Sequence, residues 1–588
     1  MDIDAVTLAV LKGRLEQIAD EMDATLFRSA FNPIIAEAHD ASHGLYDAVT
    51  GDTLVQGKSG LPIFVGVMAF AVRAAIARAA RSGGPVDGDV YIFNDPYEGG
   101  THLSDFKLVR PFFHDGKVFC WLASVGHWHD VGGNVPGNYN PVATESFQEG
   151  VHIPPVKLVS AGTLNTDIVD ILRTNSRLPL SLYGDLNGQV NALELGHRRL
   201  QELLADYGAA TVAEGLRELR VRAARQMRAH IAELPDGTYS AEDFLDNDGI
   251  VDQPLRIALD LTVRGEEMVM DFSRSALPCA GPVNIARSTA IASCYVALKH
   301  VFRDVPANAG CLEPVRFVIP EPSILAASAP KPVGGYTETI LRVIDVVFQA
   351  LAAACPERVN GCAYGTINAL SLAGHRGDGR RWVMFSFFGG GLGGNPEGDG
   401  LNHGNAPIST ATIPPVEILE AAYPVLFSRW ALRPDSAGPG WHRGGLGAVY
   451  EIELLEEQAD VFLFGERGRF PPRGVLGGGA AALTHFTYPD GDGERSPPMC
   501  SKLVGASLRR GQRIRLETPG GGGYGDPRRR AAEAVKADVE RGYVSAAAAR
   551  RDYGVALRAD LSVDPAATAA LRAESGRTGA ARRLEAAE

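Results

Sequence analysis

The sequence lacks the cysteine pattern of a disulfide scaffold or a thiolate metal site. Its 588 residues contain seven cysteines, an odd number, and no two of them are spaced as C-x-x-C. Scattered cysteines of this kind fit a reducing compartment. We therefore expect no thiolate zinc site, and we expect a cytoplasmic location.

The chain also lacks an excess of positive charge and a long apolar run. Its net charge of −13 argues against a surface built for nucleic-acid phosphates. The first residues, MDIDAVTLAV, are acidic before the first apolar stretch, which makes a poor secretory signal. We find no apolar run near the roughly 18 residues that a spanning helix needs. We expect a soluble protein that has neither a membrane nor a nucleic acid as its partner.

The composition that remains is that of a large globular chain. Hydrophobic residues make up 45% and charged residues 22%, and the length exceeds what one hydrophobic core usually serves. Helical spacing over 4–30, β-rich runs from about 45 to 160 and further helices predict a mixed α/β (α+β), multi-domain fold. The predicted domains are an N-terminal α/β domain (1–233), a central α/β domain (234–420), a glycine-rich β domain (421–526) and a helical C-terminal tail (527–588).

Glycine is concentrated between residues 385 and 525, in FGGGLGGNPEGDG, GWHRGGLGAV and TPGGGGYGDP. Such density favours close approach of backbones over long regular elements. FGGGLGG matches G-x-G-x-x-G, but the NPEGDGLN that follows cannot begin the long helix which a dinucleotide site requires. TPGGGGYGDP lacks the GK[ST] ending of a phosphate loop. We therefore expect no cofactor-binding glycine loop in this chain.

The segment NDPYEGGTHLSDF, residues 94–106, combines turn formers with a histidine and two aspartates. It leads into an apolar run, the turn Asp115-Gly116 and a second apolar run, which together predict a β-hairpin. If those two residues form the turn, Ser104 faces His127 and His102 faces His129. The Cβ atoms of two facing residues in such a hairpin lie about 5 Å apart.

The hairpin would bring imidazoles and carboxylates to its open end. The residues concerned are His102, Asp105, His127, His129 and Asp130. The two halves echo each other, because HLSD and HWHD both read H-x-x-D. Nitrogen and oxygen donors without thiolate suit Zn²⁺, Mn²⁺ or Fe²⁺, and a metal with an open position lowers the pKa of a bound water. The alternative is that the aspartates cap turns and the histidines are satisfied polar residues at a sheet edge.

Several long motifs resemble the hydantoinase B/oxoprolinase family. They are GDVYIFNDPYEGGTHLSDFKLVRPFF, GHWHDVGG, PGNYNPVATESFQEGVHIPPVKL, NSRLPLSLYGDLNGQ and, near the C-terminus, TPGGGGYGDPRRR. The resemblance runs from about residue 5 to residue 555. It implies a hetero-oligomer with a hydantoinase A-type ATP-binding subunit. It also implies either ATP-dependent hydrolysis of a small cyclic amide or ATP-dependent carboxylation of a ketone.

The family resemblance also implies a ligand set for one divalent metal (Zn, Mn or Fe). Relatives with a described metal site hold the metal with Asp, His, Asp and His, which correspond here to Asp40, His102, Asp105 and His127. Asp40 comes from the segment EAHDASHGLYD. We expect Asp130 to handle a proton, because histidines that bind a metal usually need a partner for their other nitrogen. His129 and Glu149 are expected to be structural.

One residue departs from the family pattern. Many relatives carry a histidine in the segment that reads GLPIFVG here, where Phe64 stands instead. We therefore expect the difference to affect the substrate more than the metal. The leading hypothesis is the metal-bearing subunit of a cyclic-amide hydrolase whose ATP is bound by the partner. The alternatives are a subunit of a ketone carboxylase that uses no biotin and a non-catalytic scaffold for the partner.

Overall fold

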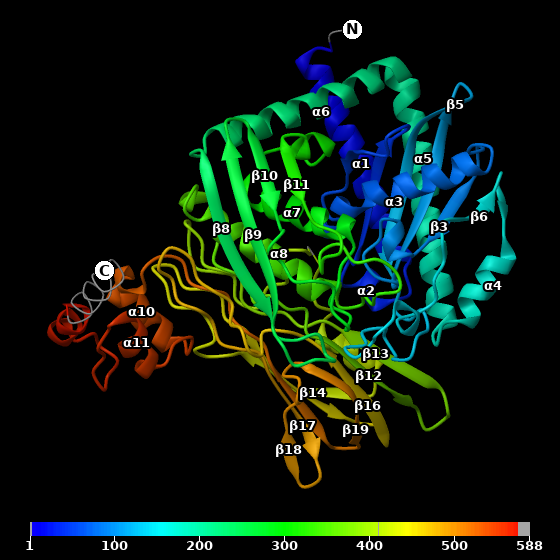
Figure 1. Ribbon diagram of the computed structural model, residues 1–588. Helices are drawn as coiled ribbons and strands as arrows, with labels where there is room; N and C mark the ends of the chain where they lie inside the picture. The colour runs from blue at the N-terminus through cyan, green and yellow to red at the C-terminus, as the bar shows by residue number, and fades with distance from the viewer. Residues whose placement is uncertain (1–2, 410, 574–588) are drawn as a thin grey trace.

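The computed structural model describes residues 3–409 and 411–573 and contains helices and several separate sheets (Figure 1). This confirms the predicted mixed α/β class. The helix predicted over 4–30 is α1 (Ala5–Ser29), and the predicted helical tail contains α10 (Ala532–Glu540) and α11 (Ala546–Tyr553). The end of that tail, 574–588, lies outside the described residues. The division into four domains stays a prediction.

A seven-stranded antiparallel sheet forms the N-terminal part of the molecule, in the order β2-β1-β5-β4-β3-β6-β7. The strands are β1 (Ala41–Asp47), β2 (Thr53–Gln56), β3 (Val90–Phe93), β4 (Asp105–His114), β5 (Lys117–His127), β6 (Val156–Ser160) and β7 (Thr163–Leu164). The predicted hairpin is the pair β4 and β5 at the centre of this sheet.

Helices cover both faces of this sheet. The packed helices are α1, α2 (Pro33–Ala36), α3 (Pro62–Arg81), α4 (Thr166–Thr174) and α5 (Pro179–Tyr207). Because side chains alternate along a strand, Phe106 and Leu108 of β4 enter the core that contains α1 and α5, whereas Val109 enters the core that contains α3. Asp105 has the same parity as Val109 and therefore projects toward the α3 side.

The predicted register of the hairpin is wrong by one residue over most of its length. His114 pairs with Lys117 as predicted, but a β-bulge between Phe112 and Phe113 shifts every pair beyond it. Asp105, rather than Ser104, therefore faces His127. A shift of one residue moves side chains to the opposite face, so the bulge places Asp105 and His127 on the same face.

The expectation that no apolar run approaches the length of a membrane span is also wrong. The helix α3 is long and apolar enough to cross a membrane, judged by length and composition only. Its apolar side chains, including Val67 and Met68, are buried in the core, and a Cβ on Gly66 would stand 2.8 Å from the Cβ of Ala292 in α7 (Arg287–Val301). Phe64, which marks the departure from the family pattern, is buried in the first turn of α3.

The helix α6 (Ala209–Ala232) runs across the top of the molecule in Figure 1. The segment that comes after it in the sequence forms a second layer of sheet and helices. The sheet β11-β10-β9-β8 packs against α7 and α8 (Tyr336–Leu351), and β9 and β10 form an antiparallel hairpin within it. The strands are β8 (Gly237–Leu245), β9 (Leu255–Arg264), β10 (Glu267–Asp271) and β11 (Val315–Val318).

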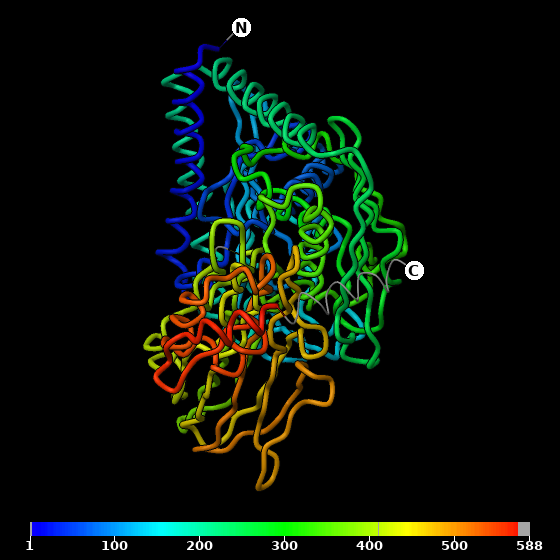
Figure 2. Tube along the Cα trace, turned by 90° about the vertical axis from the view of Figure 1, so that its left-hand side faces the viewer, coloured from blue at the N-terminus to red at the C-terminus, as the bar shows by residue number. Residues whose placement is uncertain are grey.

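Two further sheets enclose a separate core and lie opposite the N-terminus in both views (Figures 1 and 2). Their orders are β13-β12-β16-β19 and β14-β15-β20-β17-β18. The elements are β12 (Ala369–His375), β13 (Arg381–Ser386), α9 (Val416–Ala422), β14 (Val425–Leu432), β15 (Ala448–Leu454), β16 (Gln458–Phe464), β17 (His485–Asp490), β18 (Gly493–Arg495), β19 (Lys502–Arg509) and β20 (Arg513–Glu517).

The glycine-rich segments pack backbone against backbone. Gly394 N–H donates to the Gly522 carbonyl at 2.9 Å, and Gly521 N–H donates to the Gly445 carbonyl at 3.0 Å. A Cβ on Gly391 would stand 1.9 Å from the Gly445 carbonyl oxygen. Side chains are therefore excluded from these segments by space, which confirms the close backbone approach predicted from composition.

We predict opposite effects of alanine at two glycines. Gly521→Ala is expected to lower the unfolding free energy by about 3 kcal/mol, because overpacking strains the backbone and the new Cβ would stand 2.0 Å from the Leu392 carbonyl oxygen. Gly13→Ala, in helix α1 with nothing within 4 Å of the new Cβ, should raise it by about 0.5–1 kcal/mol. Unfolding followed by calorimetry checks both. Equal behaviour of the two variants would contradict the close packing.

Candidate metal centre

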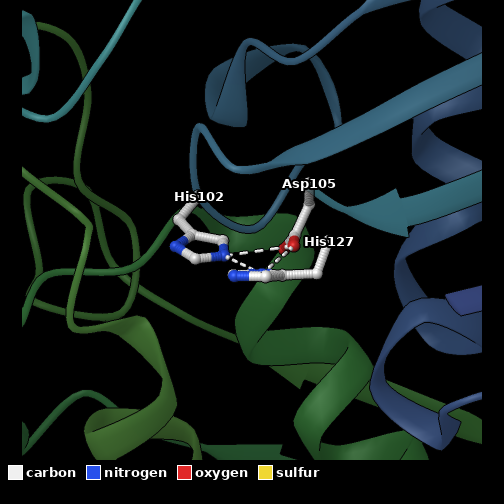
Figure 3. Close-up of side chains that lie close together, drawn as sticks. All are labelled: His102, Asp105 and His127. Atoms are coloured by element: carbon white, nitrogen blue, oxygen red, sulfur yellow. Dashed lines mark hydrogen bonds and ion pairs between the residues drawn. The ribbon is translucent and has the colours of Figure 1, made fainter. Parts of the chain in front are cut away.

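Three buried side chains converge at the open end of the β4–β5 hairpin (Figure 3). His102 lies in the loop before β4, Asp105 begins β4, and His127 ends β5. The atoms His102 Nε2, His127 Nδ1 and Asp105 Oδ1 lie 3.1 Å from one another in every pairing. The three residues are between 0% and 2% exposed. The structure therefore brings together three of the four predicted metal ligands.

The loop that carries His102 is fixed by its own turn formers. Asn94 donates through Nδ2 to the carbonyls of Leu103 and Val151, at 2.7 and 2.8 Å. Gly99 has a φ of 82°, and a Cβ there would stand 2.4 Å from the backbone nitrogen of Ala71 in α3. The segment NDPYEGG is thus a tight turn that delivers His102 beside Asp105.

Hydrogen bonds hold the Asp105 carboxylate in its ionised form. Its Oδ2 accepts a short hydrogen bond from Thr101 Oγ1, and its Oδ1 faces both imidazoles. Burial by itself would raise the pKa of Asp105, but the charge of His102 and the hydrogen bonds to His102 and His127 hold that pKa well below its ordinary value. Asp105 is therefore an anion at neutral pH.

Asp40 approaches this cluster from the start of β1. Its carbonyl accepts a hydrogen bond from His127 N–H at 3.1 Å. Part of the residue reaches the surface, but its Oδ1 is inaccessible to solvent and has no hydrogen-bond partner within 3–409 and 411–573. Burial raises the pKa of Asp40 to about 7, an effect that His127 opposes and the negative charge of Asp105 reinforces. The structure does not gather Asp40 into the group of three converging donors, and its buried Oδ1 has no partner among the described residues.

Aromatic rings from three other parts of the chain enclose the imidazoles. The His102 ring lies 4.9 Å from the ring of Tyr336, the first residue of α8, and 5.4 Å from that of Tyr139. Phe385 of β13 stacks on His127 at 5.6 Å and on Tyr139 at 5.0 Å. Sequence reasoning missed these rings. Tyr139 lies in the motif PGNYNP, but no local signal marks Tyr336 or Phe385.

The carboxylate of Asp130 is engaged elsewhere. It forms an ion pair with Arg177 at 3.0 Å and accepts hydrogen bonds from the N–H groups of Arg177, Gly132 and Gly137. The structure therefore does not bring a free Asp130 oxygen to the cluster, and these bonds favour a structural role. The proton-handling role remains a prediction.

The two residues expected to be structural are both buried. Burial lowers the pKa of His129 to about 4, so its imidazole is neutral at pH 7. Glu149 accepts hydrogen bonds from Val333 N–H and Gly334 N–H, at 3.0 and 2.7 Å, and so fixes the loop that leads into α8.

The donor set fits one divalent metal. Two imidazole nitrogens and a carboxylate oxygen point at a common centre, and among the described residues the buried Asp40 Oδ1 has no hydrogen-bond partner. Buried polar atoms without partners are costly in a protein core. Nitrogen and oxygen donors of this kind suit Zn²⁺, Mn²⁺ or Fe²⁺.

Comparison with known proteins defines the class. A sequence model described as hydantoinase B/oxoprolinase matches residues 4–527. Caprolactamase subunit beta of Pseudomonas jessenii is 35% identical, over 97% of this chain and 99% of its own length. The chain therefore belongs to the hydantoinase B/oxoprolinase family.

Two solved structures share the fold. The crystal structure of the ATP-dependent caprolactamase from Pseudomonas jessenii superposes with a TM-score of 0.88 at 33% identity, covering 97% of this chain and 100% of the matched chain. A nucleotide-free structure of acetone carboxylase also reaches a TM-score of 0.88, covering 98% of this chain and 84% of the other. Its identity of 21% limits that likeness to the fold.

We predict that Asp185→Asn removes a pH dependence of stability. Asp185 Oδ1 accepts from Phe31 N–H and Asn32 N–H, its Oδ2 has no partner, and Asn32 Nδ2 donates to the His127 carbonyl. Burial raises the pKa of Asp185 from 3.8 to about 7.

A raised pKa means that the folded state binds the proton more tightly than the unfolded chain does. The stability that Asp185 contributes is therefore complete below the unfolded pKa and is lost as the pH rises through about 7. Asparagine keeps the accepting oxygen without a charge. Thermal unfolding at pH 5 and pH 8 should show a smaller loss of stability for the variant than for wild type, and an unchanged difference would contradict the prediction.

Proposed function

We propose that this chain is the metal-bearing subunit of an ATP-dependent hydrolase that acts on a small cyclic amide. The observation that carries the proposal is the convergence of His102, Asp105 and His127 within 3.1 Å in a member of the hydantoinase B/oxoprolinase family. The 35% identity with a caprolactamase subunit supports a cyclic amide as the substrate class.

An amide resists attack because resonance lowers the reactivity of its carbonyl carbon. Transfer of a phosphoryl group from ATP to the amide oxygen would convert that oxygen into part of a good leaving group. We place this step in a partner subunit of the hydantoinase A type, so that the working protein is a hetero-oligomer. Two observations support this division: the relative is called a beta subunit, and the glycine segments of this chain are filled by their own backbones.

The residues of the cluster supply what the next step requires, which is the attack of water on the activated carbonyl carbon. Asp40, His102, Asp105 and His127 would hold one divalent metal, which when bound lowers the pKa of water and polarises a carbonyl group. Thr101 keeps the second oxygen of Asp105 occupied, so the carboxylate presents Oδ1 to the centre. Tyr139, Tyr336 and Phe385 enclose the imidazoles and exclude bulk water, which strengthens every electrostatic interaction inside.

The amide hydrolase is favoured over the ketone carboxylase by sequence. The relation to caprolactamase covers nearly the whole of both chains at 35% identity, whereas acetone carboxylase shares the fold at 21%. A non-catalytic scaffold would not explain why two imidazole nitrogens and a carboxylate oxygen converge in the buried interior of this chain.

We predict that His102→Ala or His127→Ala weakens divalent-metal binding at least about 100-fold. Loss of a ligand should exceed the roughly 10- to 100-fold cost of losing a residue that only supports a ligand. His114→Ala is the matched control, because His114 is a 39% exposed histidine at the other end of the same hairpin. Metal content after dialysis measures the effect. Retained metal in either cluster variant would refute the ligand assignment.

Activity of the complex tests the substrate class. The chain, purified with its ATP-binding partner and loaded with metal, should hydrolyse ATP in the presence of a lactam, a hydantoin or 5-oxoproline and release the ring-opened product. His127→Ala should abolish ring opening. Consumption of a ketone that depends on bicarbonate, without amide hydrolysis, would instead favour the carboxylase.

A further inference from the structure

A chain of buried hydrogen bonds links helices α1 and α5 to the strands that carry the cluster. Trp128 Nε1 donates to Gln189 Oε1 at 2.9 Å, and Gln189 Nε2 donates to Ser124 Oγ at 3.2 Å. Ser124 Oγ lies 2.9 Å from His43 Nε2, and His43 Nδ1 lies 2.7 Å from Asp23 Oδ1. All five side chains are between 0% and 1% exposed.

The indole donor at one end fixes the direction of the first two hydrogen bonds of this series. An indole nitrogen can only donate, so Gln189 must accept through Oε1 and donate through Nε2. Ser124 Oγ accepts the hydrogen bond from Gln189 Nε2, which leaves its own hydroxyl hydrogen to point at His43 Nε2. His43 therefore carries its proton on Nδ1 and donates it to Asp23.

The order Ser124, His43, Asp23 matches that of a hydrolase triad, but Ser124 cannot act as a nucleophile here. Its side chain is 0% exposed, and its oxygen already accepts a hydrogen bond from Gln189. The three residues lie between the sheet and two helices, with Leu45, Leu108 and Leu122 of the sheet in the same core. Ser124, His43 and Asp23 are thus inaccessible to a substrate.

We propose that this hydrogen-bond chain positions the metal ligands Asp40 and His127, an inference that rests on the metal centre of the proposed function. Trp128 directly follows His127, and β1, which carries His43, begins immediately after Asp40. His43 and Ser124 are paired across β1 and β5. The link between them therefore locks together the two strands from which Asp40 and His127 extend.

A second set of contacts shows that the backbone around His127 is fixed from several directions. The His127 carbonyl accepts from Asn32 Nδ2 at 2.9 Å, and Trp128 N–H donates to the Ser104 carbonyl at 2.8 Å. Trp128 also stacks on Phe106 at 3.9 Å, with ring planes 10° apart. Packing alone would hold the indole in its plane, whereas the bond to Gln189 fixes its rotation and its depth. Ser124, Gln189 and His43 are thus positioning residues.

The test is the affinity of the purified chain for Zn²⁺ and Mn²⁺, measured by competition with a chromophoric chelator in the absence of ATP and substrate. Ser124→Ala removes the central link and should weaken metal binding about 10-fold, in line with other residues that orient ligands. Ser293→Ala is the matched control, because Ser293 is also 0% exposed but bonds only within α7, to the Thr289 carbonyl. It should leave the metal affinity unchanged.

Two further variants break the hydrogen-bond chain at the end formed by Gln189 and Trp128. They keep the test decisive if Ser124→Ala does not fold. Gln189→Met keeps the length of the side chain without its amide, and Trp128→Phe keeps an aromatic ring against Phe106 without the indole N–H. Each should weaken metal binding about as much as Ser124→Ala. Thermal unfolding of the metal-free variants separates this effect from a general loss of stability.

The outcomes distinguish this inference from the proposed function. If wild type binds metal and the folded variants bind it equally tightly, the positioning role is refuted and the metal centre stands. If the variants lose only thermal stability, the hydrogen-bond chain stabilises the fold without positioning the ligands, and the inference is again refuted. If wild type itself takes up no divalent metal, the metal centre and the positioning role both fail.

Discussion

The pairing of Asp105 with His127 is the constraint on which the rest of the site depends. Both residues stand at the open end of one antiparallel hairpin, where facing side chains lie close enough to bind the same metal ion. A single bulge near Phe112 sets this pairing, because without it the two side chains would point to opposite faces of the sheet. The site therefore depends on one irregularity about seven residues away along β4.

Burial gives the cluster its chemical character. Removal from water would neutralise an isolated carboxylate, yet Asp105 stays ionised because Thr101 and two imidazoles supply hydrogen bonds and charge. Asp40 lacks such partners, and its pKa rises to about 7. A divalent cation would supply the positive charge that this arrangement of buried carboxylates and oriented nitrogens leaves unbalanced. Electrostatics and geometry thus favour the same occupant.

Much of the site was predictable from local sequence. The turn Asp115-Gly116 and the two H-x-x-D motifs predict that His102, Asp105 and His127 lie at the same end of the hairpin, and the structure has them there. The bulge was not predictable, because it depends on how β5 twists against its neighbours. Tyr336 and Phe385 could not be found either, since they reach the cluster only through the packing of α8 and β13 against the first sheet. Asp130 illustrates the opposite limit: its place beside the histidines in the sequence gave no sign of its bond to Arg177, 47 residues away.

In the glycine-rich region, composition likewise predicted only part of the structure. The density of glycine predicted close backbone approach, which is present, but not which segments meet. Gly394, Gly445 and Gly521 come together only because strands far apart in the sequence close around a separate core. The family resemblance supplied Asp40, which no local spacing connects to the hairpin.

The most direct test of the central claim is X-ray absorption spectroscopy at the metal edge of the purified chain after it has been loaded with one equivalent of Zn²⁺ or Mn²⁺. The account predicts a coordination shell of nitrogen and oxygen only, with the outer-shell scattering of two imidazoles. A shell that contains sulfur, a shell without imidazole, or a protein that retains no metal would contradict it.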